Sequence, residues 1–308
     1  MTGQLDALSW RGLSCYTANL AGYLAAEWDA RSLLARSVRL AVRLDRLTGT
    51  LAFSHHAPAL DRLPDGTRLR YAPAESPAAA LAALAEELAG FARALAVVDT
   101  ARLPWSPAYG GESAPHWLLI DGREGGRWHV ADLFSGLLPA GEQRPHAGWM
   151  DSRQLRDAVT LPARWRPEQD VRNSLAFGDP VPVPAEPGAL TLHRFAADAA
   201  DGAGPGEGWL VGDRDALPFL ADFLAAQGAA AVRYREDVWA VAGHRAFVYR
   251  WRLATTGGRP EADRRALAQW ERLPRLLHIA LESALRRRPR PTLVRSAFQE
   301  LLRVEGLA

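Results

Sequence analysis

Two short apolar runs joined by glycines constrain the fold of this chain most strongly. WLLID at 117–121 and WHVAD at 128–132 have the length and the aromatic and β-branched content of strands. The residues between them, 122–126, read GREGG and supply the glycines that a hairpin connection needs. The pattern therefore predicts two antiparallel strands, and the run AVVD, which ends at Asp99, predicts a further strand of a sheet.

Helical periodicity precedes this sheet. In residues 15–28 the apolar side chains from Leu20 to Trp28 recur at spacings of three and four, so we expect a helix that begins at Cys15. A second, amphipathic helix is expected over 31–47. The remaining expectations for the first half are a proline- and glycine-punctuated loop at 57–75, an alanine-rich helix over 76–95 with Ser76 as N-cap and Pro77 as first residue, and a short helix near 151–159.

The sequence pattern of the second half predicts a separate domain. Prolines in 178–188 disfavour both a helix and an interior strand, so we place a connection at 166–188, after an N-terminal domain of residues 1–165. A mainly helical C-terminal domain is expected over 189–308. Its predicted elements are short strands at 190–195 and 209–211, a flexible loop between them, and helices at 214–227, 230–253, 261–286 and 291–304.

The composition excludes several classes of protein. Of 308 residues, 48% are hydrophobic and 23% are charged, which is typical of a soluble globular chain. All 37 basic residues are arginine, so mechanisms that need a phosphate-binding lysine or a lysine Schiff base are excluded. A net charge of +2 gives no reason to expect a nucleic-acid partner. The chain also lacks an apolar run of membrane-spanning length and a signal-peptide pattern, so we expect no membrane partner and a cytoplasmic location.

The single cysteine, Cys15, is the candidate nucleophile. One cysteine excludes an internal disulfide and any multi-cysteine metal site. The N-terminus of a helix favours a thiolate, because the helix dipole is positive there and backbone N–H groups are unsatisfied. The alternative is a cysteine that is simply buried as a small apolar residue.

His116 and Asp132 complete a possible catalytic set. They lie 16 residues apart near the open end of the predicted hairpin, so they become cross-strand neighbours. Asp132 can then fix the tautomer of His116, whose other ring nitrogen is left for Cys15. This predicts a nucleophile, a base and an orienting carboxylate in the chain order Cys, His, Asp.

The same segments resemble a known family. SCYTANLAGYL around Cys15, VVDTARLPWSPAYG at 97–110, HWLLIDG at 116–122 and HVADLF at 129–134 are similar to the butirosin biosynthesis protein H type of acyltransferase, which is itself similar to papain-like peptidases. The resemblance covers about the first 160 residues and implies an α+β, papain-like fold with a helical C-terminal extension. It also implies that Cys15 takes an acyl group from the phosphopantetheine thioester of an acyl or peptidyl carrier protein and passes it to a small amine, as in antibiotic biosynthesis.

Further residues are candidates for contact with the substrate. Papain-like enzymes carry an oxyanion glutamine six residues before the cysteine, where this chain has Ser9. The backbone N–H of Cys15 is therefore the first expected oxyanion donor, with Ser9, Trp10 and Asn19 as the others. Asp99 is expected to bind either a loop or the acceptor amine, and Trp105 and Tyr109 belong to the matching segment and are candidate substrate contacts.

Three alternatives remain open at the level of sequence. The same triad would serve a cysteine peptidase, a thioester hydrolase or a cyclising release enzyme, because the acceptor pocket decides the outcome. A protein without catalytic activity could use the groove or the run Arg286–Arg290 to bind an acidic carrier protein. The pair His55-His56 could bind a metal, but adjacent strand residues point to opposite faces and no further ligand spacing completes a site. No metal or bound cofactor is expected, and the carrier protein would deliver its own phosphopantetheine.

Overall fold

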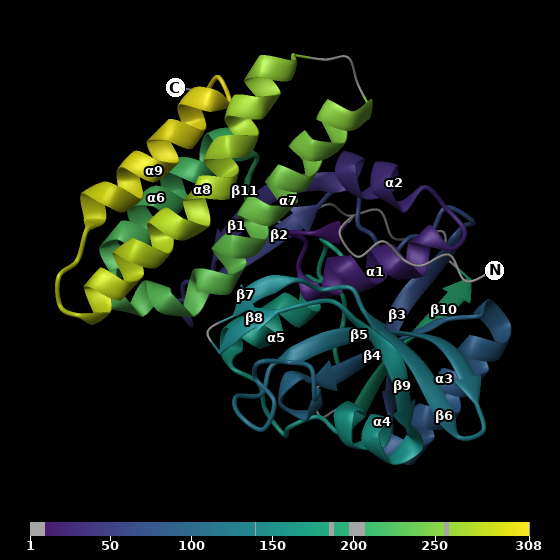
Figure 1. Ribbon diagram of the computed structural model, residues 1–308. Helices are drawn as coiled ribbons and strands as arrows, with labels where there is room; N and C mark the ends of the chain where they lie inside the picture. Colours follow the sequence, from purple (N-terminus) through teal and green to yellow (C-terminus); the bar gives the residue numbers. More distant parts are fainter. Residues whose placement is uncertain (1–9, 139, 185–187, 197–206, 256–258, 308) are drawn as a thin grey trace. The chain divides into compact units, whose positions relative to one another are not determined.

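The computed structural model describes residues 10–138, 140–184, 188–196, 207–255 and 259–307 and has an α+β architecture with antiparallel sheets (Figure 1). Its packing divides the chain into two compact units. Residues 1–33 and 59–203 form the first, here called the sheet unit, and residues 34–58 and 204–308 form the second, the helical unit. The expected limits at 165 and 189 do not coincide with this division, because residues 34–58 pack with the C-terminal helices and residues 189–196 join the first sheet.

Within the described residues, six strands form the antiparallel sheet of the sheet unit. The hairpin predicted at 117–132 is confirmed, and its two strands lie next to each other near one side of the sheet. The strands in spatial order are β3 (Thr67–Ala74), β10 (Ala189–Ala196), β4 (Ala94–Asp99), β5 (Pro115–Glu124), β6 (Arg127–Asp132) and β9 (His146–Asp151).

Helices cover both faces of this sheet (Figure 1). On one face, α3 (Pro77–Phe91) and α4 (Ser152–Val159) pack on a core that includes Ala96, Leu118 and Val130. On the other, α1 (Cys15–Ala25) packs on Trp117 and Leu119. The remaining elements are the 3-10 turn η2 (Thr100–Arg102), the hairpin β7 (Gly136–Leu138) and β8 (Gly141–Gln143), and α5 (Pro167–Ser174). The predicted cap of α3 is confirmed, since the Ser76 side chain accepts a hydrogen bond from Ala79 N–H.

Three local expectations for this unit are wrong. The segment expected to be a loop contains β3, in which Leu69 and Tyr71 alternate with arginines, and Pro73 is tolerated because β3 is an edge strand. The alanine-rich helix ends at Phe91, and β4 begins at Ala94. The connection expected at 166–188 contains α5, and residues 185–187 of it lie outside the described part.

The helical unit has a small sheet and several long helices. Its antiparallel strands are β1 (Val38–Leu44), β2 (Leu51–His56) and β11 (Leu210–Val211), in the order β11-β1-β2. One apolar core joins this sheet to the helices and includes Leu40, Phe53, Trp270 and Phe298. The helical elements are α6 (Asp213–Gln227), η3 (Gly228–Tyr234), α7 (Arg235–Thr255), α8 (Pro260–Leu285) and α9 (Pro291–Val304). The four expected helices are confirmed, except that residues 230–234 belong to the 3-10 segment η3 and α7 begins at Arg235. The flexible loop expected before β11 falls mostly at 197–206, outside the described residues.

The expectation of one amphipathic helix over 31–47 is wrong for residues 38–47. Helix α2 (Ala30–Ser37) ends at Ser37, and the chain continues directly as β1. Val38, Leu40, Val42 and Leu44 alternate with other residues, so this segment also fits the two-residue period of a strand. Pairing with β2 and β11 decides between the two periods, because it satisfies the backbone and buries Leu40 and Val42 in the core.

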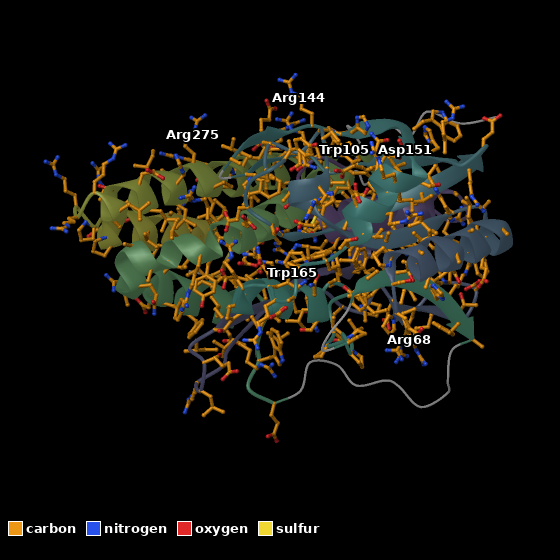
Figure 2. All side chains as sticks on the ribbon, turned by 90° about the horizontal axis from the view of Figure 1, so that it is seen from below. Arg68, Trp105, Arg144, Asp151, Trp165 and Arg275 are labelled. Atoms are coloured by element: carbon orange, nitrogen blue, oxygen red, sulfur yellow. The ribbon has the colours of Figure 1, made fainter. Side chains whose placement is uncertain are left out.

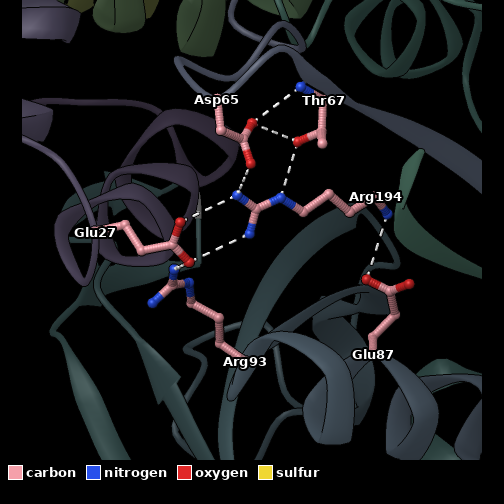
Figure 3. A network of polar contacts seen from close by, with 6 residues as sticks. All are labelled: Glu27, Asp65, Thr67, Glu87, Arg93 and Arg194. Atoms are coloured by element: carbon pink, nitrogen blue, oxygen red, sulfur yellow. Dashed lines mark hydrogen bonds and ion pairs between the residues drawn. The ribbon is translucent and has the colours of Figure 1, made fainter. Parts of the chain in front are cut away.

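The chain just beyond the end of α1 is held by a network of charged side chains around Arg194 on β10 (Figure 3). Only 3% of the Arg194 side chain is exposed, and its guanidinium binds both Glu27, which follows α1, and Asp65. Arg93 also binds Glu27, and the backbone N–H of Arg194 donates to Glu87 on α3. A buried arginine needs such partners, so the network fixes the end of α1 against β10.

Gly22 allows α1 to approach the sheet closely. A Cβ atom added at Gly22 would overlap the side chain of Leu133 and would lie 3.0 Å from Leu119. We expect Gly22→Ala to lower the free energy of unfolding by about 1–2 kcal/mol, because overpacking outweighs the gain in helix propensity. Gly90→Ala on α3 is the matched control. Nothing lies within 4 Å of the added Cβ there, so it should stabilise by up to about 1 kcal/mol. Equal effects in chemical denaturation would contradict the close approach.

Candidate active site

Cys15 is the first residue of α1 and is partly exposed. Ser14 caps the helix, and its side-chain oxygen accepts a hydrogen bond from Thr17 N–H at 3.3 Å. The cap leaves the backbone N–H of Cys15 among the groups that the helix itself does not satisfy. The sulfur therefore lies at the positive end of an eleven-residue helix, where a thiolate is favoured.

His116 and Asp132 come together at the open end of the β5–β6 hairpin. The register pairs Leu119 with Ala131, which places Asp132 opposite Leu118 and makes His116 its diagonal neighbour on the same face. His116 Nε2 lies 2.9 Å from Asp132 Oδ2, and both side chains are almost wholly buried. The two groups form an ion pair in which the ring N–H is not aligned as a straight hydrogen bond to any described atom. Because Nε2 faces Asp132, Nδ1 is the nitrogen left for Cys15.

Five groups surround the Asp132 carboxylate, which has no exposed surface. Oδ2 contacts His116 and accepts hydrogen bonds from Trp105 Nε1 at 2.8 Å and Gln143 Nε2 at 2.7 Å. Oδ1 accepts from Asn19 Nδ2 at 3.2 Å and from Phe134 N–H at 3.1 Å. A buried carboxylate with this many donors stays ionised.

The pKa values of His116 and Asp132 depend on the charges of their neighbours. Burial alone would lower the pKa of His116, but the negative charges of Asp132 and Cys15 outweigh it and raise that pKa to about 10. Burial likewise opposes ionisation of Asp132, and the contacts with His116, Trp105 and Asn19 keep the pKa of its carboxyl below the usual value. The arrangement therefore favours a protonated His116 beside an ionised Asp132.

Asn19 was expected to be a possible oxyanion donor, and the structure corrects this. Its side chain is fully buried, and Nδ2 lies within hydrogen-bond distance of the carbonyl oxygens of Trp117 at 2.7 Å and Cys15 at 3.1 Å as well as Asp132. Its Oδ1 accepts from Leu133 N–H at 2.9 Å. Since the amide is fully engaged, Asn19 joins α1 to β5 and β6 instead of facing a substrate.

The remaining residues expected to contact the substrate lie in different environments. Trp105 borders the site: its ring stacks on His146 with centroids 4.1 Å apart, while its N–H binds Asp132. Asp99 holds a loop, accepting from Ala101 N–H at 3.0 Å and Ser113 Oγ at 2.7 Å, which is one of its two expected roles. Tyr109 is 60% exposed and Trp10 is buried, whereas Ser9 lies outside the described residues.

The sequence analysis did not predict an aromatic cluster of Tyr16, Tyr71 and Trp117. The hydroxyl groups of Tyr16 and Tyr71 donate to the side-chain and backbone oxygens of Asn173 on α5, at 2.8 Å and 2.9 Å. Both rings pack edge-on against Trp117. Burial and the charge of Cys15 raise the pKa of Tyr71, so its hydroxyl stays neutral. These residues lie far apart in the sequence, and no local pattern joins them.

His55 and His56 meet a third histidine in the helical unit. The ring of His244 on α7 stacks on His55 at 4.8 Å and packs edge-on against His56 at 5.0 Å. His56 Nδ1 lies 3.0 Å from Ser37 Oγ, and His244 Nδ1 lies 2.6 Å from Ala240 O. Burial lowers the pKa of His244 to about 4 and that of His56 well below its usual value, with His55, His244 and Arg39 adding to the effect on His56.

This cluster predicts a loss of stability in acid. The unfolded chain binds protons below pH 6.5, while folded His244 stays neutral down to about pH 4, so stability falls as the pH drops between these values. His244 alone should contribute about 3 kcal/mol to that fall. His244→Leu should flatten the dependence in chemical denaturation at pH 4–8, and the exposed His278→Leu should leave it unchanged. Parallel curves for all three proteins would contradict the neutral, buried state.

In the residues described, no group of three or more His, Cys, Asp or Glu side chains is placed to hold a metal ion. No helix in that part of the chain is both long enough and apolar enough to cross a bilayer. No protein-family model matches the chain, and a search of curated proteins gives no match.

Proposed function

We propose that the sheet unit is a cysteine-dependent acyltransferase that forms an amide. The observation that supports this is the placement of Cys15 at a helix N-terminus beside His116, whose ring contacts a buried, ionised Asp132. The order of nucleophile on a helix and base and orienter on a sheet is papain-like, and we propose that fold for this unit. A structural cluster alone would not need a partly exposed thiol next to a protonated histidine.

The proposed reaction has two balanced steps. The Cys15 thiolate attacks the carbonyl carbon of a phosphopantetheine thioester on a carrier protein, and the pantetheine sulfur leaves with the proton of His116. An amine then attacks the acyl-enzyme, the Cys15 sulfur leaves as a thiolate, and His116 takes the proton from the amine. The Cys15 N–H is the first oxyanion donor in both steps. The products are a free carrier thiol and an amide, as in natural-product biosynthesis.

The test is intact-protein mass spectrometry after the wild-type chain is mixed with acylated carrier proteins and small acyl-pantetheine thioesters. We expect a mass gain equal to the acyl group on the wild type, none on Cys15→Ser, and loss of the adduct when an amine is added. An adduct that disappears equally fast without amine would indicate a thioester hydrolase. Absence of any adduct, in protein whose Cys15 still reacts with iodoacetamide, would instead support the binding role.

A further inference from the structure

Gln143 is a buried residue for which the sequence gives no functional signal. It ends β8, is 1% exposed and donates its Nε2–H to Asp132 Oδ2 at 2.7 Å, closer than any other donor to that carboxylate. Asp132 Oδ2 is also the oxygen that contacts His116. Gln143 therefore donates to the same carboxylate oxygen whose negative charge favours protonation of His116.

The orientation of the Gln143 amide follows from its surroundings. Its Oε1 is buried and has no hydrogen-bond partner in the described part of the chain. Rotating the amide by 180° would give Oε1 a position against Asp132 Oδ2, which places two acceptors in contact. The side chain thus keeps its donor on Asp132 at the cost of an unsatisfied acceptor, which is unfavourable unless the donor is needed.

The two neutral side chains that donate to Asp132 Oδ2, Trp105 and Gln143, come from two chain segments that contact each other. Gly141, at the start of β8, lies against Pro107, because a Cβ added there would be 3.3 Å from the Pro107 side chain. The segment that contains Pro107 also carries Trp105, the other side-chain donor apart from His116. At the surface next to Gln143, Arg144 extends into solvent (Figure 2) and forms an exposed ion pair with Glu142.

We infer that Gln143 is a positioning residue that, with Trp105, fixes the Asp132 carboxylate so that Oδ2 stays against His116. This inference rests on the proposed role of Cys15 and His116. Without the Gln143 donor, Asp132 Oδ2 is left with Trp105 and His116, so the carboxylate is held less firmly against the ring and stabilises its protonated form less. The Cys15 thiolate then loses its positive neighbour. Two further titratable groups are close enough to feel the charges of this set: His146 on β9 interacts electrostatically with Asp132, and Tyr71 on β3 interacts electrostatically with Cys15.

The test measures the pH dependence of Cys15 alkylation by iodoacetamide in the full chain, where it is the only thiol. In Gln143→Met, we expect the midpoint of the rate to move about one to two pH units upward, because a less protonated His116 stabilises the thiolate less. This corresponds to a roughly 10- to 100-fold slower reaction below both midpoints. Gln143→Asn, which withdraws the amide by one methylene, should shift the midpoint in the same direction and serves if the methionine variant does not fold.

Gln169→Met is the matched control. Gln169 is also 1% exposed and its amide is bonded, to Ser113 O at 3.4 Å and Arg166 N–H at 3.0 Å, but it does not contact Asp132. An unchanged midpoint in both folded Gln143 variants, or an equal shift in Gln169→Met, would overturn the inference. Alkylation needs no acyl donor, so a missing acyl-enzyme would count against the proposed function and not against the role of Gln143.

Discussion

Replacing Cys15 by alanine is expected to lower the rate of acyl transfer by roughly 10⁴-fold or more and to leave the fold intact. The activity depends on the sulfur because the sulfur is the atom proposed to carry the acyl group. The fold does not depend on it, because Ser14 still caps α1 and Asn19, Gly22 and Glu27 still hold the helix. The free energy of unfolding should change by about 1 kcal/mol or less.

Initial rates with the donor found by mass spectrometry, together with chemical denaturation, measure both parts of this expectation. Leu47→Ala is the control, since Leu47 is 98% exposed. Full activity of Cys15→Ala would show that Cys15 is not the nucleophile. A large loss of stability would show instead that Cys15 is a packing residue.

Changing Asp132 to asparagine is expected to have the second largest effect. Two donors face Oδ1 and three groups face Oδ2, so an amide NH₂ in either position opposes at least two N–H groups. Breaking a buried ion pair in this way should lower the free energy of unfolding by about 3–5 kcal/mol. The rate of acyl transfer should fall about 10³- to 10⁴-fold, because His116 loses the charge that keeps it protonated.

The pH dependence of stability provides a further readout of Asp132→Asn. In the wild type, the pKa of His116 is raised from 6.5 to about 10, so the folded chain holds a proton that the unfolded chain has lost. The contribution of His116 is therefore complete below pH 6.5 and is lost as the pH rises to 10. Asp132→Asn should remove most of this decline. The same decline in both proteins would show that the ion pair does not determine the charge of His116.

Much of the candidate site follows from local sequence. The position of Cys15 at a helix start depends on Ser14 and the following helical period, and these act within one turn of helix. The proximity of His116 and Asp132 depends on a short glycine-rich connection, which places β5 and β6 side by side, and on the register shift between Ile120 and Gly122, which puts both side chains on the same face. The helix start and the glycine-rich turn can be read from adjacent residues because these interactions are local, whereas no local pattern predicted the register shift.

The residues around that site could not be predicted in the same way. Asn19 is 98 residues from Trp117 and 113 from Asp132, and Tyr16 is 157 residues from Asn173. Asn19 has the same chemistry in an oxyanion hole as in a buried link between a helix and two strands. Only its position in three dimensions decides which groups its amide can reach.

The sequence by itself therefore determined the α+β class, the start of the first helix at Cys15, the cap of α3, the central hairpin and most of the helices of the second half, because propensity and short-range geometry are sufficient for these elements. Tertiary structure decided that residues 38–44 form β1 and not a helix, that residues 67–74 form an edge strand, and that β10 lies between β3 and β4. It also decided that Gln143 meets Asp132. In each of these cases, a distant partner satisfies the backbone or side chain, and its identity is encoded only in the packing of the whole unit.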